Sequence, residues 1–201
     1  MNLTSITEIK EFTYKHFIDS IALEKIVKDL GSNNYNIADL GTGAGFPGIP
    51  LAIVYPNLNL TLIDSLNKRI KFIKETCEAL DIKNVNAIHS RAEDIDRNKD
   101  YREKFDICVS RAVANLTSLS EYCLPLVKIG GSFISYKSKG YEVEIAEAQK
   151  AIKVLGGEIG NIEKFELGEY GERILLDIKK IKPTPNKYPR KAGLPTKEPI
   201  K

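Results

Sequence analysis

The feature that most constrains the fold is a glycine-rich stretch, Asp39-Leu-Gly-Thr-Gly-Ala-Gly-Phe-Pro-Gly48. A short apolar run before it predicts a strand over about 36–40, and the apolar residues after it predict a buried helix over about 47–55. Strand, glycine-rich turn and helix in this order are typical of the first unit of a nucleotide-type site. Glycine allows positive φ and close approach of the backbone to a ligand, and the helix start offers unpaired N–H groups to an anionic group such as a carboxylate.

The spacing of the glycines favours one ligand class. A dinucleotide fingerprint, G-x-G-x-x-G, would place its third glycine at position 46, where this chain has Phe46. The pattern is instead Gly41-x-Gly43-x-Gly45, with Asp39 two residues before it, as in S-adenosylmethionine sites. The carboxylate of Asp39 can attract the ammonium group of that ligand, so S-adenosylmethionine is favoured over NAD. A tight turn without a ligand is the alternative.

The second predicted strand, 58–64, ends on an acid. Asp64 follows the glycine turn by roughly 20 residues, where such folds place a carboxylate on the ribose hydroxyls. The alternative is an N-cap for the next helix, because Asp is a favoured cap residue. The glycine turn upstream favours the ribose role.

The rest of the chain alternates helices and strands. Hydrophobic spacing predicts helices over 6–30 (with a break near 14–19), 66–80, 116–124 and 143–155, and strands over 84–89, 104–111, 130–136, 158–167 and 172–180. This alternation predicts an α/β fold, a Rossmann-like doubly wound sheet that is mostly parallel with one antiparallel strand near its edge. Together with the glycine stretch, it resembles the class I S-adenosylmethionine-dependent methyltransferase fold. Residues 1–181 would form a single domain, with an N-terminal helical segment (1–34) and a Rossmann-like core (35–181).

Two further positions lie where parallel strands end. In methyltransferase-like sheets the segment 90–94 holds the adenine edge, with Ala92 on the ring and Glu93 on its amino group. Equally, Glu93 can be an acid in the first turn of a short helix. Arg111 ends a central apolar strand, so it should face both cofactor and substrate. His16 and Asp19 share a helix face, as a catalytic or a structural pair.

The general properties of the chain limit its class. The sequence contains no run of eighteen apolar residues, so no membrane span is predicted. The N-terminus lacks the basic and apolar regions of a secretory signal. Cys77, Cys108 and Cys123 have neither metal-ligand spacing nor a disulfide pattern, so we expect no metal site. We expect a cytoplasmic monomer.

The basic charge is concentrated in residues 182–201, called here the C-terminal segment. Its net charge is +5 while the whole chain carries +3, and five of its twenty residues are proline. The prolines argue against a helix or a central strand. A solvated basic segment is the plain interpretation; alternatively, its Lys and Arg contact phosphates and its Tyr stacks on a base.

These motifs together resemble the bacterial ribosomal RNA small-subunit methyltransferase G family, also called glucose-inhibited division protein B. The matching segments run nearly end to end: Asn2-Leu-Thr-Ser-Ile-Thr7, His16-Phe-Ile-Asp-Ser20, Asp39 to Pro50, Ser90-Arg-Ala-Glu93, Ser110-Arg-Ala-Val-Ala114, and Lys187-Tyr-Pro-Arg-Lys-Ala-Gly-Leu-Pro-Thr-Lys-Glu-Pro-Ile200. The Phe-Pro-Gly of the glycine stretch and the C-terminal segment are not typical of methyltransferases at large.

The resemblance implies S-adenosylmethionine-dependent methylation of N7 of one guanine in 16S rRNA of the small ribosomal subunit, near the decoding site. Carried over by position, the cofactor contacts are Gly41, Phe46, Ala92, Glu93 and Arg111. Family members usually have a helical segment before the Asn-Leu-Thr stretch, so we expect a truncated or misassigned start. The family has a Lys-Gly pair after the strand predicted over 130–136, and either Lys137 or Lys139 could match its lysine.

The chemistry implied by the resemblance needs little from the protein. N7 of guanine has a free lone pair, so in-line SN2 transfer would rest on proximity and orientation, with Arg111 positioning the substrate. We predict no obligatory general base among His16, Asp19 and Glu121. The sequence also lacks an Asn/Asp-Pro-Pro-aromatic motif after 104–111 and a placed Pro-Cys nucleophile. The residues expected to contact RNA are Lys137, Lys139, Lys187, Arg190, Lys191 and Lys197.

Three rival functions remain open. A methyltransferase of a small molecule or protein would leave the basic segment without a role. A non-catalytic RNA-binding module would bind RNA without affinity for S-adenosylmethionine. A dehydrogenase would bind a nicotinamide cofactor.

Overall fold

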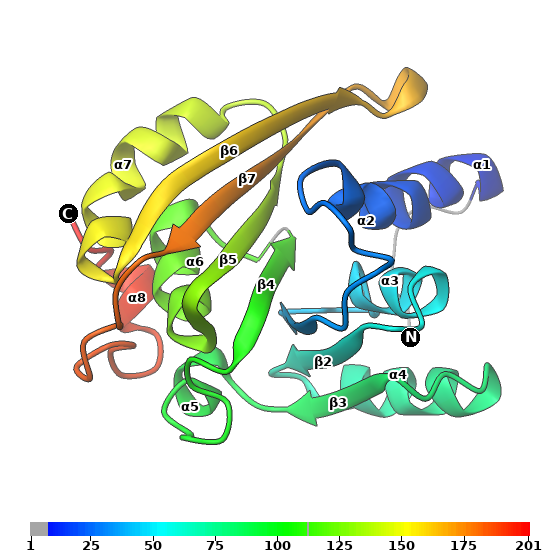
Figure 1. The fold of residues 1–201 in the computed structure, drawn as a ribbon, viewed down its shortest axis with the longest axis horizontal. Helices are drawn as coiled ribbons and strands as arrows, with labels where there is room; N and C mark the ends of the chain where they lie inside the picture. Colours follow the sequence, from blue (N-terminus) through cyan, green and yellow to red (C-terminus); the bar gives the residue numbers. More distant parts are fainter. Residues whose placement is uncertain (1–7, 112) are drawn as a thin grey trace.

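The computed structural model describes residues 8–111 and 113–201, and within them seven strands form one sheet (Figure 1). The strands are β1 (Asn36–Leu40), β2 (Asn59–Asp64), β3 (Val85–His89), β4 (Phe105–Arg111), β5 (Val127–Lys137), β6 (Gly157–Glu166) and β7 (Glu172–Lys180). Their order is β3-β2-β1-β4-β5-β7-β6. The β7 strand runs antiparallel to both neighbours, and the other pairs are parallel. The predicted sheet, mostly parallel with one antiparallel strand, is confirmed.

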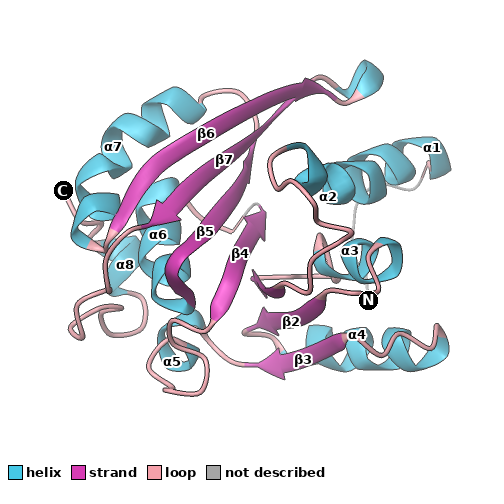
Figure 2. Cartoon of the chain, in the orientation of Figure 1, coloured by secondary structure: helices cyan, strands magenta, loops and turns pink. Residues whose placement is uncertain are grey.

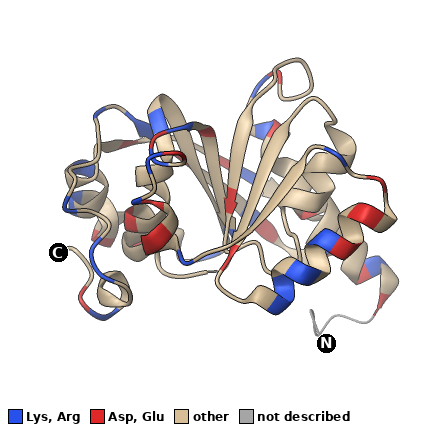
Figure 3. Ribbon diagram, turned by 90° about the horizontal axis from the view of Figure 1, so that it is seen from below, with Lys and Arg blue, Asp and Glu red and all other residues tan. Residues whose placement is uncertain are grey.

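Helices cover both faces of this sheet, as Figures 2 and 3 show. Beyond the N-terminal region they are α3 (Gly48–Val54), α4 (Asn67–Ala79), α5 (Ala92–Ile95), α6 (Leu116–Cys123), α7 (Tyr141–Val154) and α8 (Leu194–Lys197). None of the helices among the described residues combines the length and apolarity that a membrane crossing requires.

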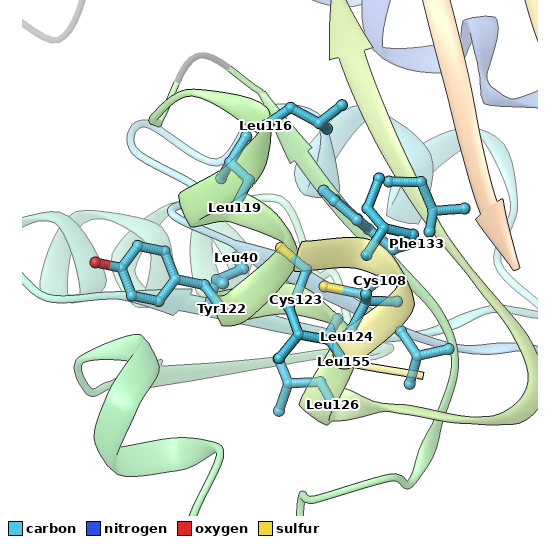
Figure 4. Close-up of a cluster of buried hydrophobic side chains, with 14 of the residues drawn as sticks. Leu40, Cys108, Leu116, Leu119, Tyr122, Cys123, Leu124, Leu126, Phe133 and Leu155 are labelled. Atoms are coloured by element: carbon cyan, nitrogen blue, oxygen red, sulfur yellow. The ribbon is translucent and has the colours of Figure 1, made fainter. Parts of the chain in front are cut away.

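Two buried apolar clusters lie on the two faces of the sheet. One contains residues of α6 and α7 (Figure 4), and the other contains residues of the N-terminal helices, α3 and α4. Alternate residues of β4 serve the two clusters: Cys108 lies in the first, while Ile107 and Val109 lie in the second. This is expected of a central strand covered on both faces, because successive side chains point to opposite sides.

The N-terminal helical region changes its helix type along its length. It comprises α1 (Ile9–Phe12), the π-helical η1 (Thr13–Ile18), α2 (Asp19–Ile21) and the 3-10 helix η2 (Ala22–Lys25). The predicted start at 6–7 lies outside the described residues. The prediction that the helix continues to residue 30 is wrong: the following residues form turns, and Asp29 has φ 59°, a left-handed conformation that no helix continues.

A second correction concerns the C-terminal segment, which was expected to contain no helix. A single turn, α8, forms there with Pro195 near its start. Proline is tolerated in the first turn because its missing N–H would have no helical partner there. At the sheet, β5 begins earlier than predicted, since Val127 pairs with Phe105 before the register shifts.

Candidate active site

The glycine turn lies where the strand order reverses. The first strand, β1, is flanked by β2 on one side and β4 on the other, so the carboxyl ends of these strands open a crevice of the kind in which α/β folds bind ligands. Gly41, Gly43 and Gly45 have φ of 73°, 62° and 97°. A Cβ at Gly45 would lie 2.5 Å from Cγ1 of Ile49, so this position requires glycine both for its φ and for space.

Asp39 ties the turn together from the end of β1. Its Oδ2 accepts hydrogen bonds from the Thr42 hydroxyl (2.6 Å) and the Gly48 amide (2.9 Å). Its Oδ1 is buried and has no hydrogen-bond partner among residues 8–111 and 113–201. Burial raises the pKa of the Asp39 carboxyl to about 6, against the opposing effect of the Thr42 and Gly48 hydrogen bonds. A buried acceptor without a partner is costly unless a donor reaches it.

A cavity of about 540 Å³ opens beside the turn at the ends of β1 and β2. Its lining is Leu40, Gly41, Ile63, Asp64, Ser65, Leu66, Arg69, Ser90, Arg91, Ala92, Glu93, Val113, Tyr122 and Gly193. Four of the predicted cofactor residues meet there: Gly41, Asp64, Ala92 and Glu93. The other four, Asp39, Gly43, Phe46 and Arg111, lie outside this lining.

Asp64 joins the turn to the second strand. Its Oδ2 accepts from the Gly43 amide (3.0 Å) and from Nη1 of Arg69 (3.1 Å), and its Oδ1 accepts from the Leu66 amide (2.9 Å). The N-cap alternative is wrong, because the N-cap of α4 is Leu66 and no side chain caps that helix end. The carboxylate lies on the cavity wall, where the predicted ribose contact requires it.

Glu93 has the position that both interpretations require, and its contact with adenine stays a prediction. It lies in the first turn of α5 and also lines the cavity. Its Oε1 accepts the amide of Gly193 (2.9 Å), which comes from the C-terminal segment. Tyr122 and Gly193 complete the same wall. Neither is predicted from the sequence to lie there, because Tyr122 belongs to no motif and Gly193 lies in the C-terminal segment, far along the chain from the glycine turn.

Arg111 is bound to the N-terminal helices rather than to the cavity. Its Nη1 donates to Asp19 Oδ2 (2.8 Å) and to the Lys15 carbonyl (3.1 Å), and its Nη2 lies 3.2 Å from Nδ1 of His16. Its guanidinium is 5.5 Å from the ring centroid of Phe46, and that ring stacks on His16 at 4.8 Å. The π-helical turn thus brings His16 to Phe46 of the glycine turn, while Asp19, at the start of α2, contacts Arg111. The predicted Ser110-Arg-Ala-Val-Ala114 motif includes residue 112, which lies outside the described residues.

A second cavity, of about 440 Å³, lies on the other side of Arg111. Its lining is Asp19, Arg111, Ala114, Tyr136, Lys137, Ser138, Lys139, Glu144 and Arg173. Nζ of Lys137 lies 2.6 Å from Glu144, and Nε of Arg173 lies 3.6 Å from Asp19. Four cationic side chains against two carboxylates make this cavity suited to a polar, anionic partner.

The three acids and bases considered earlier are each engaged by an arginine. Asp19 and His16 contact Arg111, and Glu121 is buried against Arg190. Burial, and then the charge of Arg111, lowers the pKa of His16. The absence of an obligatory general base stays a prediction.

The residues expected to contact RNA fall into two groups. Lys139, Lys187, Lys191 and Lys197 are exposed. The other two, Lys137 and Arg190, are held in ion pairs with Glu144 and Glu121. The expected stacking role of Tyr188 is wrong, because its ring is buried in the apolar cluster beside α6 and α7.

Comparison with known proteins identifies the family. The model of the family described as "GidB: rRNA small subunit methyltransferase G" matches residues 1–174. The ribosomal RNA small subunit methyltransferase G of Desulforamulus reducens is 52% identical over 201 residues, covering 100% of this chain and 83% of its own length. Its counterpart in Acetivibrio thermocellus is 50% identical over 201 residues, with coverage of 100% and 81%.

Solved structures show the same fold at low identity. A SAM-dependent O-methyltransferase of Thermotoga maritima has a TM-score of 0.60 at 15% identity, covering 89% of this chain and 68% of its own. An rRNA methylase of Streptococcus thermophilus has a TM-score of 0.55 at 14% identity, with coverage of 89% and 100%. Fold, glycine turn and sequence relationship agree, and the chain belongs to the rRNA small subunit methyltransferase G family.

Proposed function

We propose that this protein transfers the methyl group of S-adenosylmethionine to N7 of one guanine in 16S rRNA of the small ribosomal subunit. The observation that carries the proposal is the glycine turn, with the buried carboxylate of Asp39 beneath it, beside the 540 Å³ cavity in a chain of this family.

The residues of the turn fit the cofactor. The carboxylate of Asp39, buried beneath the turn beside the cavity-lining Leu40 and Gly41, can attract the ammonium group of S-adenosylmethionine through its charge. The left-handed Gly41 and Gly43 let the backbone approach the ligand closely. Asp64 would face the ribose hydroxyls, while Ala92 and Glu93 would hold the adenine. The cofactor supplies a methyl group activated by its positive sulfur.

Arg111 and Phe46 would lie between the cofactor and the acceptor. Arg111 borders the second cavity and its guanidinium lies against Phe46, the residue that follows the three glycines. This place suits a role in positioning the substrate. Because N7 carries a free lone pair, the chain has no proton to remove there, and its contribution is to align the base with the methyl group.

The second cavity and the exposed lysines would bind the RNA. Lys139 and Arg173 line the cavity, and Lys187, Lys191 and Lys197 extend the basic surface outside it. Contacts of this kind to phosphates release counterions, so binding should weaken as salt rises. The most exposed apolar side chains, among them Ile9 and Val143, lie on separate elements, which supports action as a monomer. The proposed substrate, the small ribosomal subunit, places this action in the cytoplasm.

The test is methyl transfer from labelled S-adenosylmethionine to small ribosomal subunits that lack the modification. We expect label in 16S rRNA at a single guanine, at which the RNA becomes sensitive to depurination and cleavage. Binding of the cofactor without transfer to these subunits would point to another acceptor. Failure to bind the cofactor would contradict the methyltransferase function itself.

A further inference from the structure

The C-terminal segment is bound to α6 by a buried ion pair. The Glu121 side chain is 1% exposed, and Arg190 approaches it through Nη2 (2.7 Å to Oε2) and Nε (3.0 Å to Oε1). The backbone amide of Arg190 also donates to Oε1 (2.7 Å). A buried carboxylate needs such partners, so this contact fixes the position of the backbone at residue 190.

Further hydrogen bonds fix the chain on either side of Arg190. On the near side, Nη2 of Arg97 donates to the Pro189 carbonyl (2.8 Å). On the far side, the Ser118 hydroxyl donates to the Pro195 carbonyl (2.8 Å), and the Tyr122 hydroxyl lies 3.0 Å from that of Thr196. The stretch 189–196 is therefore held against α5 and α6 by side chains of the methyltransferase core.

This stretch reaches the wall of the 540 Å³ cavity at Gly193. Its amide donates to Oε1 of Glu93, and Gly193 and Tyr122 both line the cavity. Figure 4 shows the ring of Tyr122 at the edge of the buried cluster, with its hydroxyl directed away from the other labelled side chains. Gly193 has φ 81°, the conformation from which α8 begins.

The hydrogen bond matters because α5 cannot position Glu93 alone. The helix has four residues, and its N-cap, Arg91, makes no side-chain cap. Such a short helix has little stability of its own. One oxygen of Glu93 is anchored by Gly193, while a carboxylate has capacity for further donors.

We propose that the C-terminal segment is part of the cofactor site. The Gly193 amide holds the Glu93 carboxylate where that carboxylate accepts a hydrogen bond from the exocyclic amino group of adenine. In this way the segment sets the preference for adenine. This inference rests on the proposed function. Gly193 is a positioning residue, acting through Glu93. A hypoxanthine ring has an oxygen where adenine has the amino group. That oxygen and the Glu93 carboxylate are both hydrogen-bond acceptors, so they cannot form the hydrogen bond.

The experiment compares two ligands by calorimetry, S-adenosylhomocysteine and its analogue with hypoxanthine in place of adenine. The first variant ends after Ala192, which removes the Gly193 amide and keeps Arg190 with Glu121. The second is Gly193→Ala, which strains the backbone at φ 81°, although no described atom lies within 4 Å of the added Cβ. The control is Gly130→Ala, a remote site with φ 85° and the same open space.

We expect the intact chain and Gly130→Ala to prefer the adenine ligand by about tenfold or more, the effect of one hydrogen bond to a charged group. The protein that ends after Ala192 should lose most of that preference, with little change in affinity for the hypoxanthine ligand, and Gly193→Ala, which keeps its amide, should lose less. An unchanged preference in folded protein that ends after Ala192 would overturn the inference and leave the proposed function standing. No binding of either ligand to the intact chain would contradict the proposed function, and the inference with it.

Discussion

The glycine turn (39–48) and the C-terminal segment (182–201) are both rich in residues that interrupt regular structure, but they are held in opposite ways. In the turn, Asp39 bonds to Thr42 and Gly48, three and nine residues away. In the C-terminal segment, Arg190 bonds to Glu121 and Gly193 to Glu93, 69 and 100 residues away. The local contacts of the turn are visible in the sequence as a spacing of glycines and an acid. The distant contacts of the C-terminal segment are not, because its proline-rich basic composition is also typical of a solvated segment.

The largest expected effect comes from breaking the distant contact. Arg190→Met leaves the buried carboxylate of Glu121 without its guanidinium partner, although the amide of residue 190 still donates to it, and this should cost about 3 kcal/mol of unfolding free energy. Urea denaturation measures the loss. The double variant Glu121→Met with Arg190→Met removes both charges and should recover most of it. If the single variant were as stable as the parent, the segment would not be anchored by this pair.

The next effect concerns the carboxylate of the turn, through its pKa. Asp39 has a pKa of about 6 in the folded chain, above its ordinary 3.8, so the folded protein holds this proton more tightly than the unfolded chain does. Its ionisation therefore destabilises the fold as pH rises from about 4 to 6, and the cost is fully present above pH 6. Relative to the parent, Asp39→Asn should gain about 2 kcal/mol of unfolding free energy between pH 4 and pH 7.

Denaturation at the two pH values checks this, with calorimetry of S-adenosylhomocysteine alongside. The substitution should weaken binding of this ligand, because the neutral asparagine side chain that replaces the carboxylate cannot attract the ammonium group of the ligand. A stability difference that stays constant with pH would show that Asp39 is not buried as described.

A smaller effect separates two glycines of the turn. Gly45→Ala combines φ 97° with a Cβ that meets the buried Ile49, and it should cost roughly 2–3 kcal/mol. Gly43→Ala carries the backbone strain at φ 62° with its nearest described atom 4.0 Å away, and should cost roughly 1 kcal/mol. Urea denaturation of the pair gives the comparison. Equal losses would mean that space around Gly45 does not matter.

The smallest stability effect belongs to the exposed lysines of the C-terminal segment. Lys191→Ala and Lys197→Ala should each change the unfolding free energy by less than about 0.5 kcal/mol. Each should reduce the slope of log affinity for RNA against log salt by about one. Filter binding over a salt series measures the slope, and an unchanged slope would remove that lysine from the RNA contact.

Much of the turn could be predicted from the sequence because glycine spacing and a following acid encode geometry within a few residues. The alternation of predicted strands and helices indicates the sheet. Because parallel strands end at the same edge of a sheet, it also indicates that Asp64, Ala92 and Glu93 meet there. The opposite charges of Asp19 and Arg111 are visible in the sequence, but the two residues are 92 positions apart, and no local spacing rule predicts their pairing.

The role of the C-terminal segment could not be predicted in the same way. Five prolines and a net charge of +5 describe equally well a solvated chain and a chain fixed by side chains elsewhere. The distinction rests on Glu121, a buried acid in a helix whose partner lies 69 residues further on. The C-terminal end of the N-terminal helical region is a similar case, because the left-handed φ of Asp29 (59°) leaves no signal in the hydrophobic spacing.

Hydrogen exchange of the intact chain, without RNA, tests most directly whether the C-terminal segment is a folded part of the methyltransferase domain. The decisive position is the Gly193 amide, which donates to Glu93. Exchange there should be roughly a hundredfold slower than in an unstructured peptide, and slower again with S-adenosylhomocysteine bound. Exchange at the rate of an unstructured peptide would contradict this folded arrangement and show that the C-terminal segment is a solvated basic tail.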